Sequence, residues 1–377
     1  MRFKIFMLCC IVSGAAACSR PGDAAASGAS TISAALDASP VASFQEPWTV
    51  RLLPDGGLLV TEKKGNLKRV AVDGSVGDIS GVPEVDYGGQ GGFGDVALHP
   101  EFARNGIVYL SYIEAGSGDT HGAVVARAKL SLDAGGGTLS ELSIIWRQLP
   151  KFGGRGHYGH RLRFGPDGKL WVSSGDRQEF SPAQDMSGNL GKMIRLNEDG
   201  SVVVDNPFAE RGAIAAQAWS VGHRNILGFD FDAKGRLWAA EMGPKGGDEL
   251  NLVERGRNYG WPTVSDGSHY DGRDIPDHRT APRFAAPAIT WTPVIAPGDM
   301  LIYAGGEFAQ WKGNALIAGL ASAALVRVQL DGDSVREVAR YPMGSRIRSI
   351  EQGRNGELWL LEDGPSGRLL RIRPARK

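Results

Sequence analysis

A short unit of two strands joined by a tight turn recurs along this chain and constrains the fold more than any other feature. In its clearest copy, residues 164–172 read Phe-Gly-Pro-Asp-Gly-Lys-Leu-Trp-Val, with a Pro-Asp-Gly turn between two apolar runs. Alternating apolar residues around Asp-Gly and Asn-Gly turns are the usual signal of a β-hairpin. The copies begin near Leu53, Leu98, Phe164, Phe231, Trp311 and Gly353.

The number of these copies predicts an all-β fold, a six-bladed β-propeller of four-stranded antiparallel blades. Their separation of roughly 40 to 80 residues fits blades of about 40 to 50 residues with insertions. No long segment has the 3.6-residue apolar period of a helix. Because each blade buries its faces against its neighbours, the blades should form one domain. We expect a strand within residues 44–53 to pair with the last blade and close the ring. Five or seven blades are the alternatives.

The N-terminus has the form of a secretion signal. Two basic residues precede an apolar run over residues 5–12, and small residues follow as far as Ala17. The run is too short to span a bilayer as a permanent helix. Cys18 follows three alanines and resembles a bacterial lipoprotein cleavage site, although Ala15 stands where a leucine is usual. The alternative is an ordinary signal that is cut nearby.

The domain boundaries follow from this composition. All three cysteines lie within the first 18 residues, so the mature protein should contain no disulfide. We predict a signal peptide over residues 1–18, a flexible tether over 19–40 and one propeller domain over 41–377. The protein should then be secreted to the bacterial periplasm, with a lipid anchor at Cys18 if that cysteine is modified.

The charge balance argues against a nucleic-acid partner. The chain has 42 lysines and arginines and 42 aspartates and glutamates, for a net charge of zero. No Gly-x-Gly-x-x-Gly opens a helix, which disfavours a nucleotide cofactor, and no Gly-x-Ser-x-Gly elbow is present. We expect a monomer that acts on a small molecule.

A polar or glycine-rich loop precedes the repeated unit in four of the predicted blades. Since these loops occupy the same phase of the repeat, they should meet at one mouth of the central channel, where propellers place ligands. The loops are residues 88–92, the segment around His157, residues 222–225 and residues 346–348.

The loop that starts at Gly153 carries two histidines, His157 and His160, followed by Arg161. A histidine on a loop held by strands can take a proton near neutral pH. The alternative is that His157 caps a turn or fills a crevice.

Three arginines of these loops, Arg224, Arg346 and Arg348, favour a planar polyanionic ligand, because guanidinium groups make paired contacts with carboxylates. The alternative is that each arginine forms a salt bridge within the protein. The segment over residues 258–262, Asn-Tyr-Gly-Trp-Pro, offers either aromatic faces for stacking or a packing plug between blades.

The loop over residues 243–249 is a candidate calcium site. Gly243 and Pro244 leave main-chain carbonyls free, and Asp248 and Glu249 supply carboxylates. The alternative is a tight loop with two solvated acids.

Taken in order, these motifs resemble those of one family. The sequence contains Gly-Gly-Gln-Gly-Gly, Gly-His-Tyr-Gly-His-Arg-Leu, Gly-His-Arg-Asn, Glu-Met-Gly-Pro-Lys-Gly-Gly-Asp-Glu, Asn-Tyr-Gly-Trp-Pro and Arg-Ile-Arg. It thus resembles the soluble quinoprotein sugar dehydrogenases, and more closely their bacterial aldose sugar dehydrogenase branch. The resemblance covers nearly all of residues 44–374.

The resemblance implies a six-bladed propeller that holds pyrroloquinoline quinone (PQQ) and Ca²⁺ and oxidises the anomeric hydroxyl of aldoses to the lactone. It implies that His157 is the general base and that hydride passes to the quinone, polarised by calcium. The carbonyls of Gly243 and Pro244 would bind the calcium ion. The residues that would contact the quinone are Gln90, Arg224, Asn225, Arg346, Arg348 and, by position, Trp291.

Two departures from the family pattern put activity with the quinone in question. Ala321 stands where the family has a lysine that pairs with the acid groups of the quinone. Gly156 stands where an asparagine or aspartate often precedes the base histidine and orients it. His160 is an additional histidine near the site with no role that the resemblance assigns. The natural electron acceptor is not indicated.

Two other functions fit a propeller. The first is a protein that has lost redox chemistry and binds a sugar or a partner protein at the same channel mouth, which the alanine at position 321 favours. The second is a calcium-dependent lactone hydrolase, which would need a ring of acids and asparagines around a central metal that the motifs do not contain.

Overall fold

The repeated units fold as antiparallel sheets, as the turn pattern predicts. The computed structural model describes residues 36–332 and 334–375. In that part the chain is almost entirely strand and loop, with one four-residue α-helix, α2 (Phe102–Asn105). Within the same residues no helix has the length and apolar character needed to cross a membrane. The predicted signal peptide, residues 1–18, lies outside the described residues.

Four of the sheets have four antiparallel strands each. The first contains, in spatial order, β1 (Leu36–Phe44), β24 (Gly367–Pro374), β23 (Leu358–Glu362) and β22 (Ile347–Gln352). The second contains β10 (Gly159–Phe164), β11 (Leu170–Ser174), β12 (Lys192–Leu196) and β13 (Ala218–Val221). The third contains β14 (Ile226–Phe231), β15 (Leu237–Glu241), β16 (Asp248–Val253) and β17 (Ile289–Trp291). The fourth contains β18 (Pro297–Ile302), β19 (Ala315–Gly319), β20 (Ala324–Asp331) and β21 (Ser334–Pro342).

The remaining strands form an eight-stranded sheet. In spatial order they are β2 (Pro47–Leu52), β3 (Leu58–Glu62), β4 (Asn66–Val70), β5 (Val76–Ser80), β9 (Gly136–Arg147), β8 (His121–Asp133), β7 (Ile107–Ala115) and β6 (Phe93–Leu98). Short 3₁₀ turns lie in the connections: η1 (Ser181–Ala183), η2 (Ala209–Arg211), η3 (Ala215–Gln217), η4 (His278–Thr280) and η5 (Ala309–Trp311).

The eight-stranded sheet consists of two antiparallel runs of four strands that join edge to edge through a parallel pairing of β5 with β9. Glycines permit this close approach: a Cβ atom on Gly77 would lie 2.0 Å from the carbonyl oxygen of Gly135. The prediction of an all-β chain built from four-stranded antiparallel sheets is therefore confirmed, with the difference that two of the runs share an edge.

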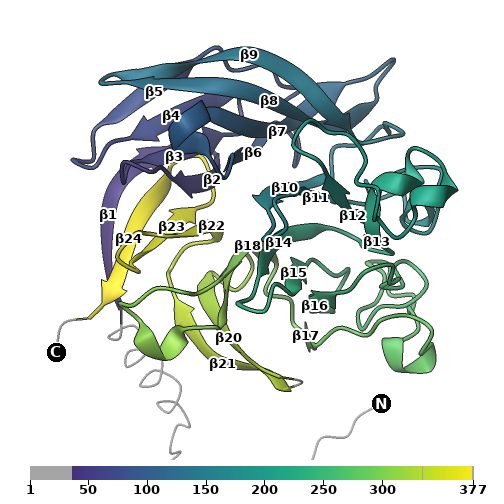
Figure 1. Ribbon diagram of the computed structural model, residues 1–377. Coiled ribbons are helices and arrows are strands. Elements are labelled where there is room, and N and C mark those ends of the chain that lie inside the picture. Colours follow the sequence, from purple (N-terminus) through teal and green to yellow (C-terminus); the bar gives the residue numbers. More distant parts are fainter. Residues whose placement is uncertain (1–35, 333, 376–377) are drawn as a thin grey trace, which may run out of the picture.

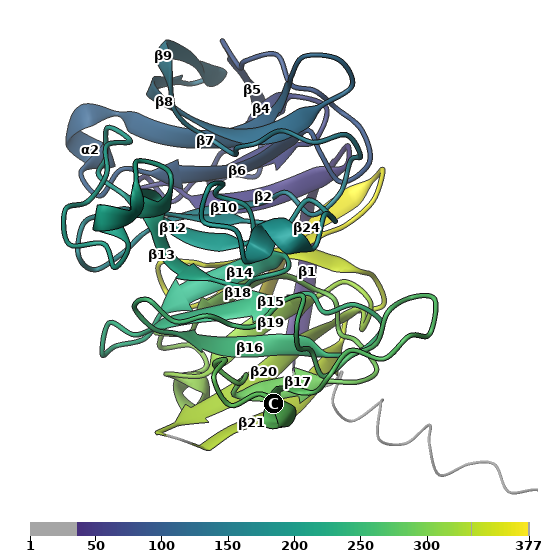
Figure 2. The ribbon, with the colours of Figure 1, turned by 90° about the vertical axis from the view of Figure 1, so that its right-hand side faces the viewer.

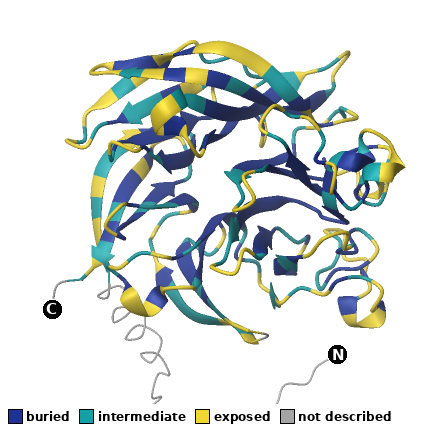
Figure 3. Ribbon diagram, in the orientation of Figure 1, coloured by how far each residue is buried: buried dark blue, intermediate teal, exposed yellow. Residues whose placement is uncertain are grey.

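The first strands of the antiparallel runs form the centre of the molecule. Strands β2, β6, β10, β14, β18 and β22 each pack against the next, and β22 packs against β2, which closes a ring. Figure 1 shows the sheets extending outward from this centre, and the side view in Figure 2 shows the inner strands β6, β10, β14 and β18 one below another. Burial follows the same order, because the inner strands are buried and exposed residues gather on the outer strands (Figure 3).

The ring is closed by a strand that lies earlier in the chain than predicted. Strand β1 pairs with β24, from Leu36 opposite Pro374 to Phe44 opposite Gly367. Residues 36–40 of the predicted tether belong to this strand, and residues 47–52 form the inner strand of another run. The sequence of β1, Leu-Asp-Ala-Ser-Pro-Val-Ala-Ser-Phe, lacks a regular apolar alternation, and four of its nine residues are exposed.

The guanidinium group of Arg161 lies at the centre of the ring. Its side chain is 2% exposed and extends from β10 to the inner strands of all the other runs. Nε donates to the carbonyl of Leu227 in β14 at 2.8 Å, and Nη1 donates to Oγ1 of Thr49 in β2 at 3.0 Å. Nη2 donates to the carbonyls of Gly298 in β18 at 2.6 Å and Arg348 in β22 at 3.2 Å.

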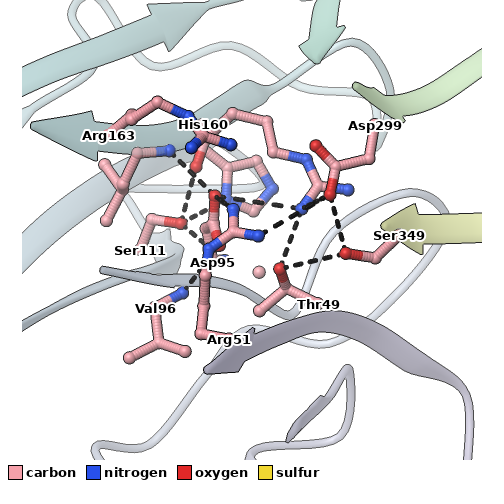
Figure 4. Close-up of polar contacts among 12 residues, drawn as sticks. Thr49, Arg51, Asp95, Val96, Ser111, His160, Arg163, Asp299 and Ser349 are labelled. Carbon is pink, nitrogen blue, oxygen red and sulfur yellow. Dashed lines mark hydrogen bonds and ion pairs between the residues drawn. The ribbon is translucent and has the colours of Figure 1, made fainter. Parts of the chain in front are cut away.

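Two buried carboxylates neutralise this centre (Figure 4). Nη1 of Arg161 lies 3.8 Å from Asp95 in β6 and 3.4 Å from Asp299 in β18, and Arg51 contacts the same two acids. Burial lowers the pKa of Arg161 to about 10, while Asp299 and Asp95 oppose the shift, so the group remains charged at neutral pH. Trp48 lies 3.8 Å from the guanidinium carbon.

Replacing Arg161 with methionine should lower the free energy of unfolding by about 3–5 kcal/mol, because two buried carboxylates lose a charge partner. The matched control is Arg279→Met. The Arg279 side chain is 83% exposed and, among the described residues, pairs with Asp277 alone. This substitution should change stability by less than about 1 kcal/mol. Urea unfolding of both variants measures the difference. Equal, small losses in both would show that the central charge cluster does not hold the ring.

Candidate active site

His157 sits on a tightly held loop just before β10. Its backbone has φ of 46°, in the left-handed region, and its N–H donates to Oε1 of Gln90 at 2.9 Å. A Cβ atom on Gly175 would lie 2.1 Å from the carbonyl oxygen of His157, so only glycine fits at that position. The loop therefore presents the imidazole in one fixed place.

The guanidinium group of Arg177 fixes the same loop through hydrogen bonds to its main-chain carbonyls. Its Nη2 donates to the carbonyl of Gly154 at 2.7 Å, and its Nη1 donates to the carbonyl of Gly156. Its guanidinium carbon lies 3.7 Å from the ring of Tyr158. No sequence motif indicates this role, because Arg177 comes after β11 and reaches the loop only in the folded chain.

The imidazole of His157 is paired with a buried carboxylate. Nδ1 lies 2.8 Å from Oδ1 of Asp176, whose side chain is fully buried. The other carboxylate oxygen accepts a hydrogen bond from Nε1 of Trp261 at 2.7 Å. Because an ionised carboxylate only accepts hydrogen bonds, Nδ1 carries the proton and Nε2 keeps a free lone pair. This arrangement makes Nε2 a base.

The surroundings keep this base neutral. Burial lowers the pKa of His157 below its ordinary value of 6.5; the hydrogen bond that Nδ1 donates to Asp176 raises it, and the positive charge of Arg224 lowers it further. The net direction is downward. At neutral pH the imidazole can therefore accept a proton.

Asp176 orients the imidazole of His157, the role that the family pattern gives to an asparagine or aspartate at position 156. A Cβ atom on Gly156 would lie 2.3 Å from Oε1 of Gln178, so an asparagine or aspartate there would require the Gln178 side chain to move. Asp176 was not singled out from the sequence, because only the packing of the loop after β11 against the His157 loop brings it to Nδ1. The concern that His157 is poorly oriented is therefore corrected.

A cavity of about 480 Å³ opens in front of His157. Phe180 and Trp261 form an aromatic wall, with ring centroids 5.6 Å apart and nearly stacked. Arg224 and Pro244 line the same cavity. Trp261 therefore faces a cavity, whereas Tyr259 is buried and stacks on His223 at 4.6 Å, so the segment over residues 258–262 combines both roles predicted for it.

Arg224 links this cavity to the candidate calcium loop. Its Nη1 donates to the carbonyls of Met242 at 3.0 Å and Gly243 at 2.7 Å, and its guanidinium carbon lies 5.2 Å from the Trp261 ring. Its Nε is buried and has no hydrogen-bond partner among residues 36–332 and 334–375. Such a buried, unpaired donor is a group that a bound ligand can satisfy.

The acids of the calcium loop are buried and not solvated. Oδ1 of Asp248 accepts from the N–H of Gly243 at 2.9 Å, and Oδ2 accepts from the N–H of Ala296 at 2.6 Å. Burial raises the pKa of Asp248 to about 6, and burial together with Glu241 raises the pKa of Glu249 well above its ordinary value. Asp248 thus shapes the loop that carries Gly243.

A metal bound here would use main-chain oxygens. Among residues 36–332 and 334–375, no group of three or more histidine, cysteine, aspartate or glutamate side chains is arranged to hold a metal. The carbonyl of Gly243 accepts from Arg224 and retains a second lone pair. Pro244 lines the His157 cavity beside it.

A second cavity, of about 170 Å³, lies on the other side of the His157 loop. Its polar wall includes Lys63, Gln90, Asn225, Arg346 and Arg348. Oδ1 of Asn225 accepts from the N–H of Gly159 at 3.1 Å, so Asn225, like Gln90, holds the loop as well as lining the cavity. The two cavities are close, because Arg224 and Asn225 are neighbours in the chain and face one cavity each.

Arg346 and Arg348 share a single carboxylate. Nε of Arg346 lies 2.8 Å from Oδ2 of Asp363, and Nη2 of Arg348 lies 2.9 Å from Oδ1. Burial raises the pKa of Asp363, but the charges of Arg348 and Arg346 outweigh it and hold that pKa below its ordinary value. Two guanidinium groups on one carboxylate leave a net positive charge. The two arginines can therefore form this salt bridge and still attract an anionic ligand.

His160 lies on the floor of the second cavity as a neutral, buried group. It stacks on Trp48 at 4.8 Å, and its Nδ1 lies 3.0 Å from Oγ of Ser111. Burial, with the charge of Arg161, lowers its pKa to about 3. A Cβ atom on Gly94 would lie 1.9 Å from the ring, which explains why glycine stands at that position.

Trp291 is the one residue of the predicted set that lies apart. It is buried at the end of β17 in an apolar cluster with Trp238, Ile295 and Val326, and its Nε1 donates to Oε2 of Glu337 at 2.8 Å. It lines neither of the two cavities. The expectation that it contacts a cofactor rests on chain position alone and stays a prediction, while the structure shows the residue packed in this cluster.

A closed ring of antiparallel sheets, with a histidine–aspartate pair and several cations around one opening, defines a propeller-type protein with an enzyme-like site. Residues 44–371 match the model of the family described as Glucose / Sorbosone dehydrogenase. The chain belongs to this family.

Several relatives are sugar dehydrogenases by name. Aldose sugar dehydrogenase YliI of Escherichia coli is 35% identical over 338 residues, which cover 88% of this chain and 91% of that protein. The apo crystal structure of the soluble E. coli aldose sugar dehydrogenase superposes with a TM-score of 0.85 at 33% identity, covering 90% of this chain and 99% of the other. The PQQ-bound aldose sugar dehydrogenase of Streptomyces coelicolor has a TM-score of 0.73 at 27% identity, with coverage of 90% and 99%.

In solution, His157 should titrate with a pKa below 6.5, and Asp176→Asn should lower that pKa further, because the carboxylate is the group that favours the imidazolium. ¹⁵N NMR of the histidine side chains against pH measures both values, and His157→Gln assigns the signal. A wild-type pKa at or above 6.5, or a higher pKa in Asp176→Asn, would contradict the buried pairing.

Proposed function

We propose that this protein is a PQQ- and calcium-dependent aldose sugar dehydrogenase that oxidises the anomeric hydroxyl of aldoses to the lactone, with His157 as general base. The observation that carries the proposal is the His157–Asp176 pair, which leaves a neutral, fixed Nε2 in front of a cavity of about 480 Å³. The family and the PQQ-bound relative supply the redox chemistry that such a base would serve.

The polar groups around the two cavities fit a flat tricarboxylate such as PQQ. Arg346 and Arg348 share the carboxylate of Asp363. The buried Nε of Arg224 has no hydrogen-bond partner in the part of the chain that the structure describes. Gln90 and Asn225 add amide groups at the same wall. Guanidinium and amide groups bind carboxylates and carbonyl oxygens in one plane, which is the recognition that a planar quinone requires.

The loop at Gly243 and Pro244 fits calcium, because calcium binds oxygen ligands, including main-chain carbonyls, in a flexible geometry. Arg224 donates to the carbonyl of Gly243 and lines the His157 cavity, and its chain neighbour Asn225 lines the second cavity. A cation on these carbonyls would therefore lie next to the cofactor. Asp248 and Glu249 are buried nearby, and a cation bound here would favour their ionised forms.

When bound, PQQ with Ca²⁺ supplies the electrophilic carbonyl that accepts hydride from the sugar. The protein's own part is to hold the sugar and remove a proton. Nε2 of His157 takes the proton of the anomeric hydroxyl, and Asp176 stabilises the imidazolium that results. Trp261 and Phe180 present aromatic faces against which the apolar face of a sugar ring can pack.

We take the eight-stranded sheet as two blades that share an edge, so that the six inner strands correspond to a six-bladed propeller. The periplasmic location and the lipid anchor at Cys18 rest on the sequence of residues 1–18. The protein would then pass electrons to an acceptor in that compartment.

The second candidate function is a propeller that binds a sugar or a partner protein at the same opening without redox chemistry. The observation in its favour is Ala321, an exposed residue after β19 that brings no charge to a position where the family has a lysine. Binding of PQQ to the pure protein separates the two functions.

With PQQ, Ca²⁺ and an aldose, the protein should reduce a redox dye, and His157→Gln should lower kcat by about 10²–10⁴-fold with PQQ affinity unchanged, because only proton removal is lost. His99→Gln is the control, since His99 pairs with Glu198 and lines neither cavity. Dye reduction that needs no PQQ, or full activity in His157→Gln, would refute the mechanism.

The acid limb of kcat/KM should lie below pH 6.5. The base works in its neutral form, which exists above its pKa, and burial lowers that pKa, so activity should persist as pH falls through 6.5. Initial rates from about pH 4 to 8 measure the limb. A loss of activity that begins above pH 6.5 would mean that another group, or a solvated histidine, controls the reaction.

A further inference from the structure

Lys63 is a cation at the candidate cofactor wall that no motif singled out. It follows β3 directly, its side chain is only 16% exposed, and it lines the second cavity together with Gln90, Arg346 and Arg348. Its neighbour Lys64 is 56% exposed and does not line that cavity. The fold therefore selects one of two adjacent lysines and turns it inward.

The ammonium group of Lys63 has unused hydrogen-bonding capacity. Nζ donates to the carbonyl of Gly89 at 3.0 Å, and its nearest carboxylate oxygen, on Glu46, is 3.7 Å away. An ammonium has three N–H donors, so one contact at hydrogen-bonding distance leaves two. Glu46 is itself engaged, because it accepts from the hydroxyl of Tyr87 at 2.5 Å and lies 3.9 Å from Lys64.

The wall of this cavity is short of negative charge. Lys63, Arg346 and Arg348 line it, and no aspartate or glutamate among the described residues does so. Behind the wall, Asp363 serves both arginines and Glu46 lies near both lysines. Four cations against two carboxylates leave an excess of positive charge that an anionic ligand would neutralise.

We infer that Lys63 binds a carboxylate of the quinone cofactor and supplies the side-chain cation that position 321 lacks in this chain. This inference rests on the proposed function. Leu320 lines the same cavity, and Ala321, the next residue in the chain, carries no charge. Lys63, which follows β3, would supply this charge from a different run of strands than the one that contains β19 and precedes Ala321.

The test is a titration of the apo protein with PQQ in the presence of Ca²⁺, followed by absorbance and tryptophan fluorescence. Lys63→Gln should weaken PQQ binding by about tenfold or more, because a charge-assisted hydrogen bond is lost. Lys63→Arg should retain most of the affinity. Lys64→Gln, which removes the same charge one residue away, should bind as the wild type does. The affinity of Lys63→Gln should also depend less on salt.

A second variant separates charge from loop support, since Lys63 also holds the carbonyl of Gly89. Lys63→Gln combined with Ala321→Lys should recover affinity if the missing charge is the cause, because a lysine at position 321 does not restore the contact with Gly89. Thermal melting checks that each variant is folded. Equal affinity in the wild type and Lys63→Gln, or an equal loss in Lys64→Gln, would overturn the role of Lys63 alone. A wild type that binds no PQQ would overturn the proposed function as well.

Discussion

One buried guanidinium group determines how the runs of strands meet. Arg161 contacts the inner strand of every other run through carbonyls, a hydroxyl and two carboxylates. Taking a charge out of water is costly, and the cost is recovered only when its donors and counter-charges are all in place. Asp95 and Asp299 meet that condition from two different strands. The centre of the ring is therefore held by directional contacts, which specify a single arrangement of the strands more strictly than apolar packing does.

The site follows from this centre. The inner strands run in the same sense, so the segments that precede them come together at one end of the ring. Gln90 precedes β6, His157 precedes β10, Arg224 precedes β14, and Arg348 lies at the start of β22. Residues that are as many as 258 positions apart in the sequence thus line adjoining cavities. The rigid frame lets a loop with a left-handed histidine keep its base in place before any ligand arrives.

Local chemistry made much of the fold predictable, and long-range packing explains what was missed. The Pro-Asp-Gly and Asn-Gly turns fix hairpins by their own dihedral preferences, and each joins the first and second strand of a run, as at Phe164 and Leu170. Strand β1 could not be recognised, because its polar, small residues resemble a linker and only pairing with β24 makes it a strand. Asp176 and Lys63 were missed for a related reason: neither lies in a distinctive motif, and each reaches the site through the packing of separate runs. Trp291 was predicted from chain position alone, and the structure places it in an apolar cluster away from the lining of both cavities.

The central claim is that distant segments form one cofactor site beside His157. A crystal structure of the protein soaked with PQQ and Ca²⁺ tests it most directly. The account predicts density for a planar ligand against Gln90, Asn225 and Arg348, with a cation at the carbonyls of Gly243 and Pro244 and Nε2 of His157 facing the open side. Density for the quinone at any other place on the molecule, with this wall left empty, would contradict the account.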